Sequence, residues 1–458
     1  MTMQRGQAGG LHKLGLLIRK VPVVGSIVWW MYMIAAAPGK IFVLSEENER
    51  LKASNQEVKK EQADLKRKLE QANQALTVSI KEMDDEVKEF ERSTGEQQKN
   101  YEAQLASLSD IITKECVELG KLKVRIPDLQ PVFIHSIFRS GSTYLWNKFR
   151  STGKFWAYHE PFHEVLLALE IRDQKKIFGT PLEEHTKFLG HPPTDKHYFW
   201  EYFTINSKVP AFQKEFTLDF FCINPDEGKE DLKDYLYFLI GYSPLRPVFK
   251  FTRSSMRSGW MKKHFDAVNI YLLRHPRFQF ESYQSHLNKG NPYFHTMTLM
   301  TIGKNQDKNS LFAELSSRYN IPRNDSVNFK DEMAWYTNEV LPHLKTKELY
   351  VLFYGIWLCS LIENLRIHAI FFNIDAVDAS PEEKQRMTAE LKHYNIDLDL
   401  SDCSIARSAN LSLHNHEFDE AEQEVHRTIR RLNLYDKGLV DQAEEYMKNK
   451  VFDARLGV

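Results

Sequence analysis

The sequence has 458 residues, 42% hydrophobic, 12% aromatic and 27% charged, and its 61 Lys and Arg residues nearly cancel its 62 Asp and Glu residues. This composition is typical of a chain that buries a core, which excludes a disordered, collagen-like or multi-span membrane protein. The balanced charge argues against a nucleic-acid partner, since binding phosphates needs a basic excess. Four cysteines without a C-x-x-C pair predict neither a disulfide framework nor a zinc knuckle, and favour a reducing compartment.

The charge and the aromatic residues divide the chain into three parts. Residues 1–43 carry a net charge of +5, residues 44–120 carry −6, and residues 121–458 contain 44 residues of each sign. Of the 56 aromatic residues, two lie in the middle part and 50 in the last. We therefore predict a membrane-associating segment over 1–43, a coiled-coil stalk over 44–120 and a globular domain that carries the chemistry over 121–458.

The first part contains an uncharged run, Val21–Ala37, preceded by Arg19 and Lys20 and containing Trp29 and Trp30. As a helix this run is about 25 Å long, short of the roughly 30 Å of hydrocarbon in a bilayer. Aromatic and basic residues suit the headgroup region, so we expect membrane association, either spanning or in the plane of the surface. The short run and the sparse cysteines favour the cytoplasmic face; a lumenal type II arrangement is the alternative.

The second part has the pattern of a long helix. Residues 44–116 contain no proline and one glycine, Gly95. Apolar and amide residues recur with 3,4 spacing over residues 41–76 and, after a skip of four residues, over residues 80–90. This pattern predicts a coiled coil with a stutter, and amide side chains at core positions favour a low oligomer number. We expect a parallel homodimer.

A short apolar run opens the third part. Pro131–Phe138 has the length and composition of a buried strand, and Leu145–Phe149 has helical spacing. A turn of small and charged residues joins the two: Arg139, Ser140, Gly141, Ser142, Thr143 and Tyr144. A strand, a small-residue turn and a helix start aim backbone N–H groups at a phosphate-like anion. Ser142 stands where a Walker A loop has its lysine, which disfavours an ATPase or GTPase.

A second strand-and-turn element lies further along the chain. Val268–Leu273 reads as a buried strand, Arg274 follows it, and Ser282 comes eight residues after Arg274. An arginine at a strand end and a serine on the next helix can hold a second phosphate. The sequence therefore predicts two anion-binding elements in one domain.

These residues resemble the sulfotransferase family that uses 3′-phosphoadenosine 5′-phosphosulfate (PAPS), and most closely its carbohydrate and bacterial branches. The turn from Arg139 to Thr143 is similar to the 5′-phosphosulfate loop, and Arg274 with Ser282 is similar to the 3′-phosphate motif. The resemblance covers about residues 130–410. It implies an α/β fold with a P-loop-like parallel sheet flanked by helices, PAPS as co-substrate, no metal, and a hydroxyl of a glycan or glycolipid as acceptor. Independent support for the sheet comes from residues 247–251 and 369–375, two further strand candidates.

The reaction needs a base for the acceptor hydroxyl and a donor for charge on the bridging oxygen, a role that suits Arg139. Glu160, 19 residues after Gly141, resembles the base of one branch of the family, and His159 or His163 is the second choice. The same residues match H-E-x-x-H, but Pro161 lies between the histidines and opposes the helical turn that a zinc site needs. We therefore expect no metal here.

Two other functions stay open: a nucleotide-dependent phosphotransferase, and a non-catalytic coiled-coil scaffold with a degenerate nucleotide fold. Arg253, Arg257 and Trp260 follow a predicted strand, and they either contact nucleotide or acceptor or form a solvated basic turn around a packed tryptophan. The apolar helical pattern around residues 350–365 predicts a core helix.

Overall fold

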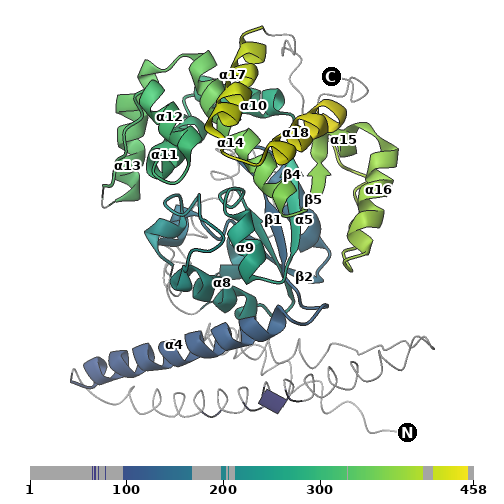
Figure 1. Ribbon diagram of the computed structural model, residues 1–458. Coiled ribbons are helices and arrows are strands. Elements are labelled where there is room, and N and C mark those ends of the chain that lie inside the picture. The colour runs from purple at the N-terminus through teal and green to yellow at the C-terminus, as the bar shows by residue number, and fades with distance from the viewer. Residues whose placement is uncertain are drawn as a thin grey trace.

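The computed structural model describes residues 96–167, 198–202, 205, 212–326, 328–405 and 416–451, with five isolated residues between 64 and 78 (Figure 1). The predicted membrane segment, and the predicted coiled coil up to residue 95 apart from those five positions, lie outside the described residues.

Five parallel strands form the sheet, in the order β2-β3-β1-β4-β5. Their side chains are almost all buried, as expected of parallel strands covered on both faces. This confirms the α/β class and the parallel sheet flanked by helices. The strands are β1 (Val132–His135), β2 (Phe155–His159), β3 (Arg246–Phe251), β4 (Val268–Leu273) and β5 (Ile370–Asn373).

Helices flank the sheet and form a second layer above it (Figure 1). Their bounds are α4 (Glu96–Lys123), α5 (Ser142–Ser151), α8 (Glu230–Tyr242), α9 (Ser258–His264), α10 (Pro276–Asn288), α11 (Tyr293–Asn305), α12 (Ser310–Arg318), α13 (Phe329–Trp335), α14 (Thr346–Arg366), α15 (Ile374–Ala379), α16 (Pro381–Lys392), α17 (His416–Leu432) and α18 (Lys437–Tyr446). Short 3-10 and π turns are η1 (Glu164–Leu167), η3 (Trp200–Tyr202), η4 (Lys214–Phe216), η5 (Tyr336–Val340), η6 (Leu341–His343) and η7 (Met447–Val451).

Local sequence accounts for several of these bounds. Strand β4 spans the predicted residues. Helix α16 begins after Ser380, whose hydroxyl caps the helix by accepting a hydrogen bond from the N–H of Glu383. Strand β2 was not predicted as a strand. It pairs with β3, and its partner residues are far away in the chain, for example His159 with Lys250.

Two apolar cores stabilise the fold. One surrounds the sheet and includes residues of α5, α8 and α16, and the other surrounds α14. Helix α14 is also the one described helix long and apolar enough to cross a membrane, but 94% of its apolar window is buried inside the protein. The prediction of a core helix around residues 350–365 is therefore confirmed.

Helix α4 packs on α8, and the predicted domain boundary after residue 120 falls inside it (Figure 1). The two backbones approach closely, since a Cβ at Gly120 would lie 1.9 Å from the carbonyl oxygen of Tyr237. Lys123 Nζ also donates to the carbonyl oxygens of Gly241 at 2.8 Å and Ser243 at 2.6 Å, where α8 ends. The end of α4 is thus built into the α/β unit.

The strand order makes the carboxyl end of β1 a candidate position for ligand binding. The chain passes from β1 to β2 on one side of the sheet, whereas β4 and β5 lie on the other side. Where such an order reverses, the loops at the carboxyl ends of the strands diverge, and α/β proteins bind ligands there. Both predicted anion-binding elements follow strands, β1 and β4, that flank this position.

Candidate anion-binding site

The turn between β1 and α5 requires glycine at Gly141. Its φ is +86°, a conformation that favours glycine, and a Cβ there would lie 2.4 Å from Cδ1 of Ile374. Arg139 in the same turn also has a positive φ, 63°. Non-glycine residues with positive φ cost free energy and are enriched at functional sites. The chain thus holds an unusual conformation at the predicted phosphate-binding turn.

The start of α5 has the properties of an anion-binding site. No side chain caps this helix end, whose first N–H groups lack acceptors within the helix. The Ser140 side chain is 1% exposed, and its Oγ has no hydrogen-bond partner in the part of the chain that the structure describes. Ser142 and Thr143 are also buried. A buried hydroxyl beside a helix N-terminus favours an anion that would accept hydrogen bonds from both.

The second predicted element lies against the first. Arg139 Nε donates a hydrogen bond of 2.9 Å to Ser282 Oγ, and an Arg274 guanidinium nitrogen donates to the carbonyl oxygen of Arg139 at 3.3 Å. Burial and the charge of Arg274 lower the pKa of Arg139. Two guanidinium groups thus share one partly buried region. We call Arg139–Thr143, the start of α5, Arg274 and Ser282 the anion cradle.

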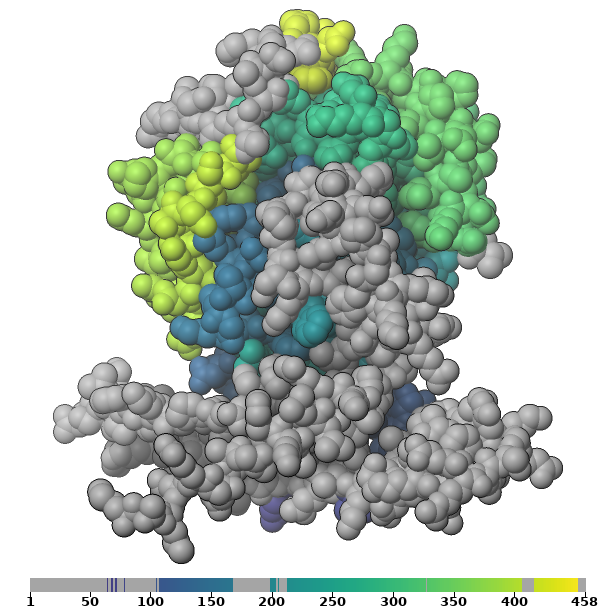
Figure 2. Space-filling model, turned by 180° about the vertical axis from the view of Figure 1, so that it is seen from behind, coloured from purple at the N-terminus to yellow at the C-terminus, as the bar shows by residue number. Residues whose placement is uncertain are grey.

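Tyr144, also predicted to bind the donor, is directed elsewhere. Its hydroxyl donates to Asp402 Oδ1 at 2.9 Å, and Lys148, one turn further along α5, forms an ion pair of 2.6 Å with the same carboxylate. Tyr144 therefore fastens α5 to the segment after α16. Seen from behind, blue surface from the part of the chain around β1 to β2 borders yellow-green surface from its C-terminal part (Figure 2).

Glu160, the first choice for the base, follows β2 with a φ of 47° and is 3% exposed. Its Oε1 accepts from Lys250 Nζ at 2.5 Å, and its Oε2 accepts from the N–H and the hydroxyl of Thr252 at 3.0 and 2.8 Å. Burial raises the pKa of Glu160, but Lys250 and Arg253 outweigh burial and hold the pKa below its ordinary value. Glu160 is therefore a buried carboxylate anion.

His159 and His163 occupy different surroundings. His159 ends β2 and is 4% exposed, and its Nε2 lies 3.2 Å from Lys250 Nζ. Because an ammonium only donates, this contact assigns the His159 proton to Nδ1. The His163 side chain is 18% exposed, and its Nδ1 accepts from the N–H of Val165 at 3.1 Å and lies 3.2 Å from Glu164 Oε2. His163 is thus the most accessible of the three candidates.

A buried network of charged residues, which the sequence analysis did not assign, surrounds Glu160. Arg253 is completely buried and donates to Glu164 Oε2 at 2.7 Å and to the hydroxyl of Tyr293 at 2.8 Å, and lies 3.6 Å from Glu160. The predicted solvated position is therefore wrong for Arg253. We call Glu160, Glu164, Lys250, Arg253 and Tyr293 the ion-pair network. One sequence signal for it existed: a lysine within an apolar parallel strand needs a buried partner.

Arg257 and Trp260 have structural contacts. Arg257 is completely buried, and its guanidinium donates to the carbonyl oxygens of Phe216 at 2.9 Å and Thr217 at 3.0 Å. Trp260 packs in the core around the sheet. The prediction of a packed tryptophan is confirmed, whereas the solvated position is wrong for Arg257.

The H-E-x-x-H residues do not share a helix. His159 ends a strand, and Glu160 has a left-handed backbone conformation, so no helical turn aligns His159 with His163. Within the described residues, no group of three or more His, Cys, Asp and Glu side chains is arranged to hold a metal ion.

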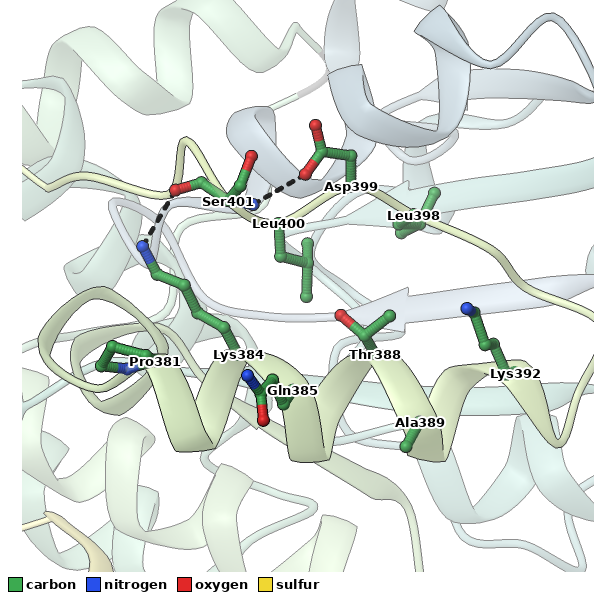
Figure 3. A pocket seen from close by; sticks show the side chains of 10 residues that line it. All are labelled: Pro381, Lys384, Gln385, Thr388, Ala389, Lys392, Leu398, Asp399, Leu400 and Ser401. Atoms are coloured by element: carbon green, nitrogen blue, oxygen red, sulfur yellow. Dashed lines mark hydrogen bonds between the residues drawn. The ribbon is translucent and has the colours of Figure 1, made fainter.

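A groove with a volume of about 580 Å³ lies between α16 and residues 398–401 (Figure 3). Lys384 spans one end of it and donates to the carbonyl oxygen of Ser401 at 3.1 Å. Ala389, Leu398 and Leu400 contribute apolar surface. None of the predicted site residues lines this groove, so the anion cradle is a separate feature.

No protein-family model, curated protein or solved structure matches this chain. The function is therefore inferred from the geometry and charge of the site.

Proposed function

We propose that the protein is a sulfotransferase that moves a sulfuryl group from PAPS to a hydroxyl of a glycan or glycolipid. One observation carries the proposal: Arg139 of the first anion-binding element contacts Ser282 of the second, and Arg274 contacts the main chain of Arg139. PAPS carries phosphate at both ends of its ribose. A donor with two separated anionic groups would therefore match two adjoining cationic elements.

The family resemblance implies that each of the two anion-binding elements holds a different phosphate group of the donor. The start of α5 and the hydroxyls of Ser140, Ser142 and Thr143 would hold the 5′-phosphosulfate, and Arg274 and Ser282 would hold the 3′-phosphate. Residues 121–458 have no net charge, so a long-range positive field cannot hold a multiply charged donor. Local contacts in the anion cradle must supply the affinity.

Sulfuryl transfer would proceed in line. The acceptor hydroxyl loses its proton to the base, its oxygen forms a bond to sulfur, and the bond from sulfur to the 5′-phosphate oxygen breaks. Arg139 would stabilise the charge that develops on this leaving oxygen. Glu160 is the first choice for the base because it resembles the base of one branch of the family, with His159 or His163 as second choices. Since Lys250 and Thr252 occupy both Glu160 oxygens, the carboxylate would have to exchange one of these partners for the acceptor hydroxyl.

Calorimetry with 3′-phosphoadenosine 5′-phosphate and with ATP tests the proposal. We expect the bisphosphate to bind and ATP to bind far more weakly. Binding of ATP alone would support the phosphotransferase alternative, and binding of neither would support a non-catalytic scaffold. Transfer of labelled sulfate from PAPS to a panel of glycans and glycolipids would then identify the acceptor.

The proposed setting of the enzyme rests on sequence. Residues 1–43 would contact a membrane surface on the cytoplasmic side, and residues 44–120 would form the homodimer. Protease treatment of sealed vesicles tests this arrangement. Digestion of residues 121–458 from outside is expected for vesicles with their cytoplasmic face outward, whereas protection would support the lumenal type II alternative.

A further inference from the structure

The junction between β5 and α15 contacts both anion-binding elements. Ile374 lies against Gly141 in the first element, where a Cβ would come within 2.4 Å of its Cδ1. Asp375 contacts the second element, because its Oδ2 accepts a hydrogen bond of 2.6 Å from the N–H of His275. Two adjacent residues of one short helix thus brace turns that lie more than a hundred residues apart in the chain.

Asp375 also faces Arg274. The Asp375 side chain is 2% exposed, and its Oδ1 lies 3.9 Å from Nε of Arg274. The position of Asp375 is itself fixed, since Asn373 Oδ1 accepts from the N–H groups of Asp375 at 3.1 Å and Ala376 at 3.3 Å. A carboxylate held in this way can restrain the Nε side of the Arg274 guanidinium. The two terminal nitrogens of the guanidinium then face away from the carboxylate.

The positive charges in the anion cradle give a physical reason for Asp375 to restrain Arg274. Arg139 and Arg274 both carry positive charge, and like charges in a partly buried region repel one another. Asp375 offsets part of this repulsion before any ligand binds. Arg274 can then keep the orientation that a phosphate requires, so less free energy is lost in ordering it on binding.

We propose that Asp375 is a positioning residue that orients Arg274 toward a 3′-phosphate and thereby sets the preference for nucleotides with phosphates at both the 3′ and 5′ positions. This inference rests on the proposed function. It adds a residue that neither anion-binding motif contains, and it assigns to that residue selectivity between two ligands.

The test compares two ligands, 3′-phosphoadenosine 5′-phosphate and adenosine 5′-phosphate, by calorimetry on the full chain. In Asp375→Asn the amide oxygen still accepts from His275, but the charge is lost. We expect binding of the bisphosphate to weaken about tenfold and binding of the monophosphate to change less than about twofold. An unchanged ratio of the two affinities would overturn the proposal. This includes an equal loss for both ligands, which would indicate a general structural defect.

Two further variants keep the test decisive. Asp375→Ser, smaller and uncharged with a hydroxyl acceptor, should give the same loss of preference, so a folding failure of one variant leaves the other. Asp378→Asn, on the same helix, is the matched control and should keep the wild-type ratio. A change in Asp378→Asn equal to that in Asp375→Asn would count against a specific role for Asp375.

A double-mutant cycle separates this inference from the proposed function. In an Arg274→Ala background, Asp375→Asn should no longer alter the ratio, because Asp375 acts through Arg274. An equal effect in both backgrounds would contradict the inference. If the wild-type protein itself does not prefer the bisphosphate, the proposed function fails first.

Discussion

At the carboxyl edge of the sheet, the cationic side chains near β2 and β3 have different partners from those near β1 and β4. At the carboxyl ends of β2 and β3, Lys250 and Arg253 are buried and lie within 2.5 to 3.6 Å of Glu160 and Glu164 carboxylate oxygens. Beyond β1 and β4, Arg139 donates to a hydroxyl and Arg274 to a carbonyl oxygen, and Asp375 lies 3.9 Å from Arg274.

The pKa shifts express the same contrast. Burial lowers the pKa of Arg253, but Tyr293, Glu164 and Glu160 outweigh burial and raise it. For Arg139, burial and the neighbouring Arg274 both lower the pKa. An incoming anion would therefore stabilise the anion cradle, whereas the ion-pair network already contains its own anions. The difference is the basis for our proposal that the anion cradle binds the charge of a ligand, whereas the cations of the ion-pair network are neutralised within the protein.

The largest expected effect is on the ion-pair network. Glu160→Gln removes the carboxylate that neutralises Lys250, and breaking a buried pair costs about 3–5 kcal/mol. We expect urea unfolding to show a loss of this size, while binding of 3′-phosphoadenosine 5′-phosphate persists and sulfuryl transfer is lost. The double variant Glu160→Gln, Lys250→Met removes both charges and should recover much of the stability but no transfer. Unchanged transfer in the single variant would exclude Glu160 as base.

The next effect concerns His135, which lies between these two parts of the carboxyl edge. Its ring nitrogens contact Ser254 Oγ at 2.7 Å and Asn269 Oδ1 at 3.0 Å. Burial lowers its pKa to about 4, although the Asn269 hydrogen bond opposes the shift. An unfolded histidine titrates near pH 6.5, so between about pH 6.5 and 4 only the unfolded chain takes up this proton.

As the pH falls through that window, the unfolding free energy should decrease by about 3 kcal/mol on account of His135. Urea unfolding between pH 7 and 4 measures this dependence. His135→Gln, which does not titrate, should show a correspondingly shallower dependence than the wild type. Parallel curves for the two proteins would mean that His135 does not titrate in this way.

The third effect concerns the turn of the anion cradle. Gly141→Ala combines a positive φ with a steric clash against Ile374, and we expect a loss of about 2–3 kcal/mol in unfolding free energy. Binding of 3′-phosphoadenosine 5′-phosphate should weaken, because either the Ile374 side chain or the turn must shift to accept the added methyl group. Gly153→Ala is the matched control: φ is +65°, but nothing lies within 4 Å of a Cβ. It should cost about 1 kcal/mol and leave binding intact; equal binding losses would contradict the assignment.

The smallest effect compares two arginines that follow β4. Arg274→Ala should weaken binding of 3′-phosphoadenosine 5′-phosphate about thirtyfold, or about 2 kcal/mol, and it should also lower stability because the buried Asp375 loses its ion pair. Arg277→Ala is the control, because Arg277 contacts Asp419 at 2.5 Å and Glu422 at 2.8 Å. We expect it to lower stability and leave binding unchanged. If Arg277→Ala weakens binding as much as Arg274→Ala, the distinction between paired and ligand-binding cations fails.

Local patterns accounted for much of the sheet and for the anion-binding residues. The β-branched and apolar run of β4 was predicted with its observed bounds, and the turn at Gly141 was recognised because small residues follow a strand there. Strand β2 was not predicted, because its five residues, Phe155–His159, adjoin a sequence that resembles a catalytic motif. The partners of Glu160 were also hidden, since Lys250 lies 90 residues away.

The sequence by itself determined the strand-turn-helix order and the residue types that can bind anions, because these depend on neighbours along the chain. Tertiary structure decided which of those residues meet. Parallel pairing of β1 with β4 brings Arg139 to Ser282, and parallel pairing of β4 with β5 places Asp375 beside Arg274. Parallel strands join only through long crossovers, so these contacts leave no local signal, and the difference between the ion-pair network and the anion cradle emerges only in the folded chain.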